Sequence, residues 1–518
     1  MSRDIYSKYV ETLKGKSAKV DFSKADPDKG PDNSSDAVTI LKEISSKLDR
    51  FEYRSPASGS VQPSGGAGTE IDLAIINGNV VLPGNGVFKA DIYISSGKIH
   101  SLGYGGNIKA GEVIDAAGKY VIPGVIDPHV HLGFSAPLET ELETETKSAL
   151  LGGITTLGCY FSEAGSYFST FQSTMGNIEE RSYTDIIPNF VISSTEQCRE
   201  ILDYINHLGV TSFKLYMNGI PGIIDDVDDG FILDVFEQIK RSSKKCLVCS
   251  HTENRDIVRN AYNKVKAEKG DKATIADWTE THPDIAEEEA AVRISYLAQK
   301  MGVPVYLVHI SSALAINTLR KIKPFNKYIN IETTSPYLSL TRQSTLGDHI
   351  KMEPPFRDAK DMEELWSAVC DDVADTIGTD NVTMTKAEKK VGSTIWDVLP
   401  GYPALETHLP VLLSEGVIKR GIPIEKVISK ITRKPAEIFN VYPRKGTLLP
   451  GSDADIAIID LDMTKEVAVS ELHSRSDFSI YEGKKLQGWP VTTIKSGKVV
   501  VKDGKYIGQK ANGVCILR

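Results

Sequence analysis

The stretch KYVIPGVIDPHVHLG, residues 119–133, carries the main signal for the architecture of this chain. It is apolar over most of residues 121–126 and then reaches His129 and His131. Such a run is typical of a strand buried in a parallel sheet. Side chains alternate along a strand, so residues two apart share a face and two imidazoles can bind one ion. The stretch therefore predicts a metal site at the C-terminal end of a parallel strand.

The same pattern recurs along the chain, where a polar residue ends an apolar run. These residues are Lys214 in TSFKLYM, His251 in CLVCSHTEN, His309 in VYLVHISS and Asp380 in DTIGTDN. Further strands are predicted in ITTLGCYF (154–161), DIIPNFVIS (185–193) and YINIETTSPYL (328–338), which makes eight. Helical patterns such as EEEAAVRISYLAQKMG lie between them. This alternation predicts an α/β fold, a (β/α)8 TIM-type barrel over residues 123–445, whose catalytic residues come from the C-terminal strand ends.

Each of these side chains alone has a structural interpretation. A lone histidine at a strand end is more often a hydrogen-bonded structural residue. Lys214 alone would be a surface lysine or a salt bridge at the barrel mouth, and Asp380 alone would be a turn residue or a helix cap. Five ligand-bearing strand ends in barrel order are specific as a set, and the set favours a metal centre.

Several further motifs make the chain resemble the cyclic amidohydrolases of the dihydropyrimidinase and hydantoinase group. They are VIPGVIDPHVHL, SALLGGITTL, EPPFRDAKDMEELW, IGTDN, KPAEIFNVYPRKGTLLPGSDADIAIID and YEGKKLQGWPV, so that the resemblance covers residues 70–510. The resemblance implies two divalent metal ions per chain, and imidazole and carboxylate ligands suit zinc. It assigns one ion to His129, His131 and Asp380, and the other ion to His251 and His309.

The resemblance also implies that Lys214 is carboxylated by carbon dioxide and bridges the two ions. A desolvated lysine beside cations loses its proton readily, which makes its amine nucleophilic. A hydroxide shared by the two ions would attack the scissile carbonyl, with Asp380 as general base and then general acid. The implied activity is hydrolysis of a C–N bond in a cyclic amide or ureide, a small-molecule substrate.

Three positions depart from the family pattern and concern the substrate. Gly133 stands where dihydroorotases have an arginine that binds the substrate carboxylate. Gly219 stands where hydantoinases and dihydropyrimidinases have a tyrosine that helps to hold the oxyanion. Residues 381–383, Asn-Val-Thr, replace a His-Cys or His-Ala-Pro segment. The metal centre is therefore expected to be intact and the substrate pocket to be altered.

Other residues are candidates for substrate contacts. The candidates are Tyr216 and Asn218 near Lys214, and Thr334 and Ser335 after the seventh strand, where family members use backbone groups. Glu353 and Arg357 precede the eighth strand, where they either line the mouth or form a solvated salt bridge.

Bulk composition limits the partners. The 518 residues include 60 basic and 69 acidic ones without a concentrated basic tract, so nucleic acid is not an expected partner. No membrane span is expected, and the N-terminus lacks the apolar core of a secretory signal, which favours a cytoplasmic location. Six scattered cysteines do not resemble a disulfide framework. The pair Cys246 and Cys249 is interpreted as two buried core thiols.

The chain ends predict additional parts. Residues 70–122 and 446–510 alternate as short strands with glycine-rich turns, which predicts a composite β-sandwich. Residues 1–69 combine an amphipathic helix near residues 36–51 with a Gly/Ser/Pro linker. The helix either packs on its own barrel or contacts a protein partner. The relatives suggest a homo-oligomer, a tetramer.

The sequence leaves three alternative functions open, one within the cyclic amidohydrolases and two outside them. An allantoinase- or lactamase-type cyclic amidohydrolase would use the same centre. A mononuclear deaminase is the second alternative, but such an enzyme has no role for Lys214. A non-catalytic, dihydropyrimidinase-like scaffold is the third alternative, although such relatives have lost metal ligands that this chain retains.

Overall fold

The computed structural model describes residues 71–518, apart from residues 104–108, 221, 345 and 509. The extension 1–69 and its predicted helix lie outside the described residues. The described part of the chain contains two sheets.

The first sheet is parallel throughout and contains every strand that was predicted for the barrel. Its strands are β6 (Val125–His131), β7 (Ile154–Phe161), β8 (Asp185–Val191), β9 (Ser212–Tyr216), β10 (Leu247–His251), β11 (Val305–Leu307), β12 (Ile329–Thr334), β13 (Thr376–Gly378) and β14 (Asn381–Val382). From β6 to β13, each strand pairs with the next one along the chain. Their C-terminal ends consequently meet at one edge.

The two ends of this sheet are joined within residues 376–382. Thr376 of β13 lies opposite Glu332 of β12, whereas Asn381 of β14 lies opposite Val130 of β6. A single stretch of chain thus pairs with the first and the seventh of the predicted strands. This arrangement is consistent with the expected (β/α)8 barrel.

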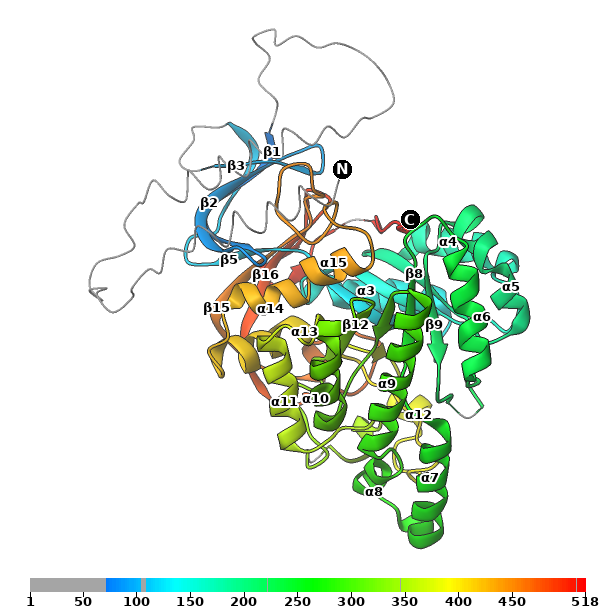
Figure 1. The fold of residues 1–518 in the computed structure, drawn as a ribbon. Coiled ribbons are helices and arrows are strands. Elements are labelled where there is room, and N and C mark those ends of the chain that lie inside the picture. The colour runs from blue at the N-terminus through cyan, green and yellow to red at the C-terminus, as the bar shows by residue number, and fades with distance from the viewer. Residues whose placement is uncertain (1–70, 104–108, 221, 345, 509) are drawn as a thin grey trace. The chain divides into compact units, whose positions relative to one another are not determined.

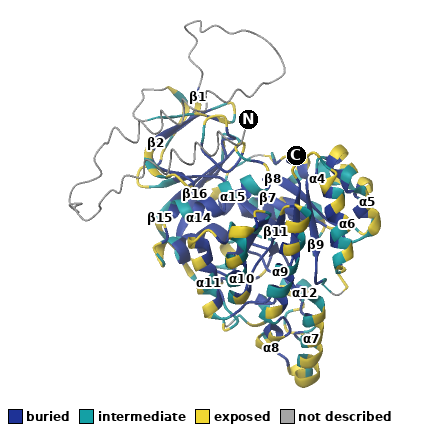
Figure 2. Ribbon diagram, viewed as in Figure 1, coloured by how far each residue is buried: buried dark blue, intermediate teal, exposed yellow. Residues whose placement is uncertain are grey.

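Helices separate successive parallel strands from β6 to β13. They are α3 (Leu138–Leu151), α4 (Phe171–Arg181), α5 (Thr195–Asp203), α6 (Asp229–Lys240), α7 (Arg255–Lys269), α8 (Ile275–Glu280), α9 (Asp284–Met301), α10 (Ala313–Ile322) and α11 (Ala359–Cys370), followed after β14 by α12 (Lys386–Lys389), α13 (His408–Leu412), α14 (Ile424–Lys430) and α15 (Arg433–Ile438). Figure 2 shows buried strands and helices whose outer surfaces are exposed. Among the helices described, none combines the length and apolarity needed to cross a membrane.

The second sheet combines strands that precede the first sheet in the chain with strands that follow it. Its strands are β1 (Ile71–Leu82), β2 (Gly86–Ser95), β3 (Lys98–Gly103), β4 (Ala110–Asp115), β5 (Tyr120–Pro123), β15 (Ile456–Glu466), β16 (Lys485–Lys495), β17 (Lys498–Lys502) and β18 (Lys505–Tyr506). The antiparallel pairing of β5 with β15 joins the two groups. In Figure 1 the blue strands therefore lie beside the orange ones.

The stretch 119–131 is two strands, and the prediction of one continuous strand was wrong. It divides at Gly124 into β5 of the second sheet and β6 of the parallel sheet. The amide of Gly124 donates to the carbonyl of Asp455 at 2.7 Å, and a Cβ at this position would clash with the side chain of Thr155. Glycine is needed here because the amide of residue 124 binds the segment before β15 while Thr155 of β7 leaves no room for a Cβ.

All six cysteines are free, and the pair Cys246 and Cys249 is buried, as predicted. Cys249 belongs to β10 and lies in the apolar core inside the parallel sheet, with Ile126, Ile187 and Tyr306.

A buried ion network ties the two sheets together. The ammonium group of Lys445 lies 2.5 Å from Asp185, 2.9 Å from Asp453 and 2.5 Å from Asp455. Asp185 begins β8, whereas Asp455 immediately precedes β15. Burial alone would lower the pKa of Lys445, but the three carboxylates raise it well above its ordinary value.

Replacing Lys445 with Met should lower the free energy of unfolding by about 3 kcal/mol, because three buried carboxylates lose the cation they share, and Lys495 remains close only to Asp185, at 2.8 Å, and Asp455, at 3.9 Å. The matched control is Arg444→Met. Arg444 is half exposed and pairs with Asp453 at 3.0 Å, so its loss should cost less than about 1 kcal/mol. Urea unfolding midpoints of both variants test this difference, and equal midpoints would contradict it.

Candidate metal centre

The six predicted metal ligands line one cavity at the C-terminal edge of the parallel sheet. They come from β6, from β9 and β10, and from the segments after β11 and β13; they are His129, His131, Lys214, His251, His309 and Asp380. Residues that are up to 251 positions apart in sequence therefore converge, as the strand pattern predicted.

Three of these side chains form a compact ligand group. The Nε2 atoms of His129 and His131 lie 3.3 Å and 3.4 Å from Oδ1 of Asp380. One ligand atom from each residue fits within 4.8 Å of the others. Within the described ranges, this is the group of histidine, cysteine and acidic side chains that is compact enough to hold a metal ion.

Buried polar atoms around this group lack hydrogen-bond partners. His129 Nε2, Lys214 Nζ and His309 Nδ1 are buried without a hydrogen bond to any described residue. The rings of His251 and His309 pack with centroids 4.7 Å apart, and the rings of His129 and His309 with centroids 5.4 Å apart. Buried polar atoms are normally satisfied, so these atoms fit a site that binds cations.

The protonation of the site also suits cation binding. Burial holds the pKa values of His129 and His309 well below the ordinary value, so both imidazoles are neutral near pH 7. Burial alone would raise the pKa of Asp380, but the neighbouring His129 and His131 lower it to about 2. Burial lowers the pKa of Lys214 to about 8. The carboxylate is therefore charged, and a fraction of the lysine is a neutral amine.

Two buried carboxylates orient the histidines, and the sequence did not single them out. Oε1 of Glu332, in β12, lies 2.8 Å from His129 Nδ1 and accepts a 3.1 Å hydrogen bond from the His309 amide. Glu253 lies 2.8 Å from His251 Nε2, and its other oxygen lies 3.0 Å from Nδ1 of His282. Carboxylates in this position fix ring orientation and ligand basicity. The available signal was a single charged residue inside a predicted strand, as Glu332 is.

Two of the predicted ligands have left-handed backbone conformations. The φ angle is +43° at His309 and +56° at Asp380, and neither residue is glycine. Such conformations are uncommon and concentrate at functional sites. They follow the ends of β11 and β13, where regular pairing stops.

The wall of the cavity is largely apolar and leaves little free space. Besides the ligands, it is lined by Phe134, Tyr216, Ile220, Ile224, Met352, Glu353, Val382 and Pro400. The free volume is about 40 Å³, so these side chains leave little open space beside the predicted ligands. A larger cavity of about 640 Å³ lies at the opposite ends of β10–β12, but it lacks the ligand group.

The candidate substrate residues separate into two groups. Tyr216 lines the cavity, and its ring centroid lies 4.9 Å from Lys214 Nζ. The other candidates are buried and do not line the cavity; they are Asn218, Thr334 and Ser335. The hydroxyl of Ser335 hydrogen-bonds to Nδ1 of His408 at 2.8 Å. Arg357 lines a different cavity.

The structure explains why residue 219 is a glycine. A Cβ at this position would clash with the backbone carbonyl of Ile224 and lie 2.6 Å from the amide nitrogen of Asp226. The loop after β9 therefore accepts no side chain at residue 219 along its present path. A tyrosine at this position, as the family pattern has it, would therefore not fit the present path of the loop.

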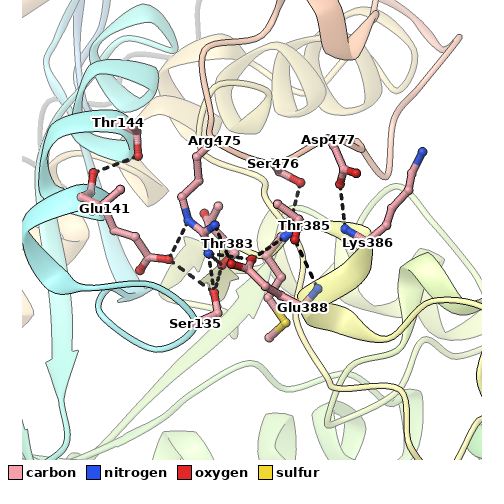
Figure 3. Close-up of polar contacts among 12 residues, drawn as sticks. Ser135, Glu141, Thr144, Thr383, Thr385, Lys386, Glu388, Arg475, Ser476 and Asp477 are labelled. Atoms are coloured by element: carbon pink, nitrogen blue, oxygen red, sulfur yellow. Dashed lines mark hydrogen bonds and ion pairs between the residues drawn. The ribbon is translucent and has the colours of Figure 1, made fainter.

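Arg475 braces two segments of the cavity wall (Figure 3). Its guanidinium donates to the hydroxyl of Ser135 at 2.7 Å and to the carbonyl of Thr383 at 3.2 Å. Ser135 follows Phe134, and Thr383 follows Val382, both of which line the cavity. Arg475 belongs to the segment between β15 and β16, so the second sheet's connection shapes the site.

Replacing Glu332 with Gln should weaken zinc binding about tenfold to hundredfold, because a neutral amide orients His129 less strongly. Glu289→Gln is the control, since this carboxylate is partly exposed and pairs with Arg293 on α9. Chelator competition measures both affinities. An unchanged dissociation constant in Glu332→Gln would contradict the orienting role.

Comparisons with known proteins agree with this geometry. Residues 120–500 match the amidohydrolase family. The chain is 32% identical to D-hydantoinase of Ralstonia pickettii over 461 residues, which are 86% of this chain and 99% of that protein. It is 29% identical to L-hydantoinase of Paenarthrobacter aurescens over 84% of this chain and 95% of the relative.

The fold agrees as well. The solved structure of dihydropyrimidinase from Brevibacillus agri NCHU1002 has a TM-score of 0.80 and 26% identity, over 86% of this chain and 98% of the other. The resemblance expected from the sequence motifs is thereby confirmed. The chain belongs to the amidohydrolase family.

Proposed function

We propose that this protein is a binuclear metal-dependent hydrolase that opens a C–N bond in a cyclic amide or ureide. The observation that carries the proposal is the convergence of the six ligands on one cavity, with His129, His131 and Asp380 within 4.8 Å. Relatives that are named hydantoinases match nearly the whole described chain. Hydantoins are cyclic ureides, so this substrate class is the first to test.

The donors divide naturally between two ions. His129, His131 and Asp380 would hold one ion, and His251 and His309 the other. Two divalent ions, zinc in the first instance, would supply Lewis-acid polarisation of the substrate carbonyl and an acidified water.

Lys214 would bridge the ions as a carbamate. Three observations support this role: its side chain is fully buried, its Nζ has no described hydrogen-bond partner, and burial lowers its pKa to about 8. A neutral amine is the form that reacts with carbon dioxide. Carboxylation would replace an unpaired buried cation with an anion suited to metal binding.

Asp380 is the proposed proton carrier. Its carboxylate is ionised, contacts both histidines of β6 and lines the cavity. It would accept a proton from the attacking water and deliver it to the departing nitrogen. Tyr216 would flank the reacting ring, because it lines the cavity, whereas substrate contacts by Asn218, Thr334 and Ser335, which do not line it, remain predictions from the sequence.

The same proposal extends to the organisation of the chain. The parallel sheet would form a closed (β/α)8 barrel over residues 123–445, and residues 70–122 with 446–510 would form the composite β-sandwich. A cytoplasmic location, a homotetramer, and a role of residues 1–69 in contacting a partner remain predictions.

Metal analysis and intact mass measurement test the centre. The protein should contain about two metal ions per chain and a carbon dioxide adduct. Lys214→Ala should remove the adduct, lower metal content and reduce hydrolysis about 100-fold or more. Lys240→Ala, on the exposed end of α6, is the matched control.

A substrate panel tests the reaction. It includes hydantoins, dihydropyrimidines, allantoin and lactams, so it also separates the allantoinase and lactamase alternatives. Two bound metals without turnover of any member would refute the proposed reaction. Metal content near zero under replete conditions would favour the scaffold alternative.

A further inference from the structure

One carboxylate in the cavity has no assigned partner. Glu353 is 8% exposed and lines the same cavity as the six metal ligands. No described residue hydrogen-bonds to its side chain or forms an ion pair with it. Burial raises the pKa of Glu353, and the nearby His282 and Lys351 only partly oppose this rise. Such a group is costly unless a ligand satisfies it.

The neighbouring cations are occupied elsewhere. Lys351 donates to two backbone carbonyls, at 2.7 Å and 2.5 Å. Arg357 faces another cavity and pairs with an aspartate of α9 at 3.2 Å. The ring of His282 is bound to Glu253 at 3.0 Å. The carboxylate of Glu353 is therefore available to a molecule that enters the cavity.

Aromatic and apolar side chains line the same cavity as this carboxylate. Phe134 and Tyr216 line the same cavity, together with Met352, which precedes Glu353. Aromatic faces attract cations, and apolar walls accept the aliphatic part of a long basic side chain. A buried carboxylate in a cavity lined by aromatic and aliphatic side chains is a suitable receptor for an ammonium or guanidinium group.

We infer that Glu353 selects substrates whose ring substituent carries a positive charge, such as cyclic ureides with an aminoalkyl or guanidinoalkyl side chain. This inference rests on the proposed function, because it concerns the substituent of the ring that the metal centre would open. Glu353 is a specificity residue, and the reacting bond lies at the metal ligands.

The test compares two substrates of equal shape. One is the hydantoin derived from lysine, and the other is its isostere in which a methyl group replaces the ammonium group. The zinc-loaded parent protein should favour the cationic substrate in kcat/KM about 30-fold. Glu353→Gln should bring this ratio close to one. Glu353→Lys should reverse the charge preference, favouring the hydantoin derived from glutamate over the one derived from lysine.

Controls separate specificity from folding and metal binding. Glu466→Gln removes an exposed carboxylate at the end of β15 and should keep the parent ratio. Metal content of Glu353→Gln should equal that of the parent. Loss of metal in that variant would identify Glu353 as part of the metal site and overturn the inference.

The outcomes distinguish the two proposals. Hydrolysis of both substrates at similar kcat/KM by the parent would overturn the role of Glu353 and leave the proposed reaction intact. Hydrolysis of neither substrate, nor of any other member of the panel, by a protein with two bound metals would overturn the proposed reaction and the inference that rests on it.

Discussion

The double pairing of residues 376–382 is the constraint on which the site depends. These residues pair with β12 through β13 and with β6 through β14. Asp380 lies between the two pairings and consequently meets the histidines of β6. Gly378 makes this possible, because a Cβ there would approach Cβ of His129 to 3.1 Å and Cδ of Glu332 to 3.3 Å. A larger residue would compete with the ligand and with the carboxylate that orients it.

The site concentrates charge where water is excluded. Lys214, Glu332 and Asp380 are buried, and burial acts on the pKa of each of them. For Glu332 it raises the pKa to about 8, and a bound cation nearby would favour the ionised form. Cation binding and the stability of this region are therefore linked, because the same cations that would take part in catalysis also offset the cost of burying these groups.

The second sheet contributes to the site from a distance. Its connection between β15 and β16 carries Arg475, which holds the segments after β6 and β14. Lys445 and its aspartates join β8 to the start of β15. Chain segments far from the ligands in sequence thus fix the wall of the cavity, which explains why sequence motifs near the ligands describe the metal centre better than the substrate pocket.

Local patterns sufficed to predict the parallel strands and the convergence of the six predicted ligands on one cavity, because both follow from alternation along a strand. His129 and His131 share a face by their spacing, and each remaining ligand marks the end of an apolar run. Alternation along a strand did not predict the division of residues 119–131 at Gly124. Both halves of this stretch are largely apolar, and they differ only in the sheet with which they pair. The orienting roles of Glu332 and Glu253 were not predicted either, because these roles depend on contacts with histidines that are distant or not marked in the sequence pattern.

By itself, the sequence determined the parallel strand pattern, the identity of the candidate ligands and the family. Tertiary structure alone decided which polar atoms meet, which remain without partners, and which loop residues form the wall. Glu353 illustrates the difference: in sequence it could equally line the mouth or form a salt bridge. Only the packing of Lys351, Arg357 and His282 against other groups leaves its carboxylate facing the cavity unpaired. Such pairings depend on distances between segments that no local pattern encodes.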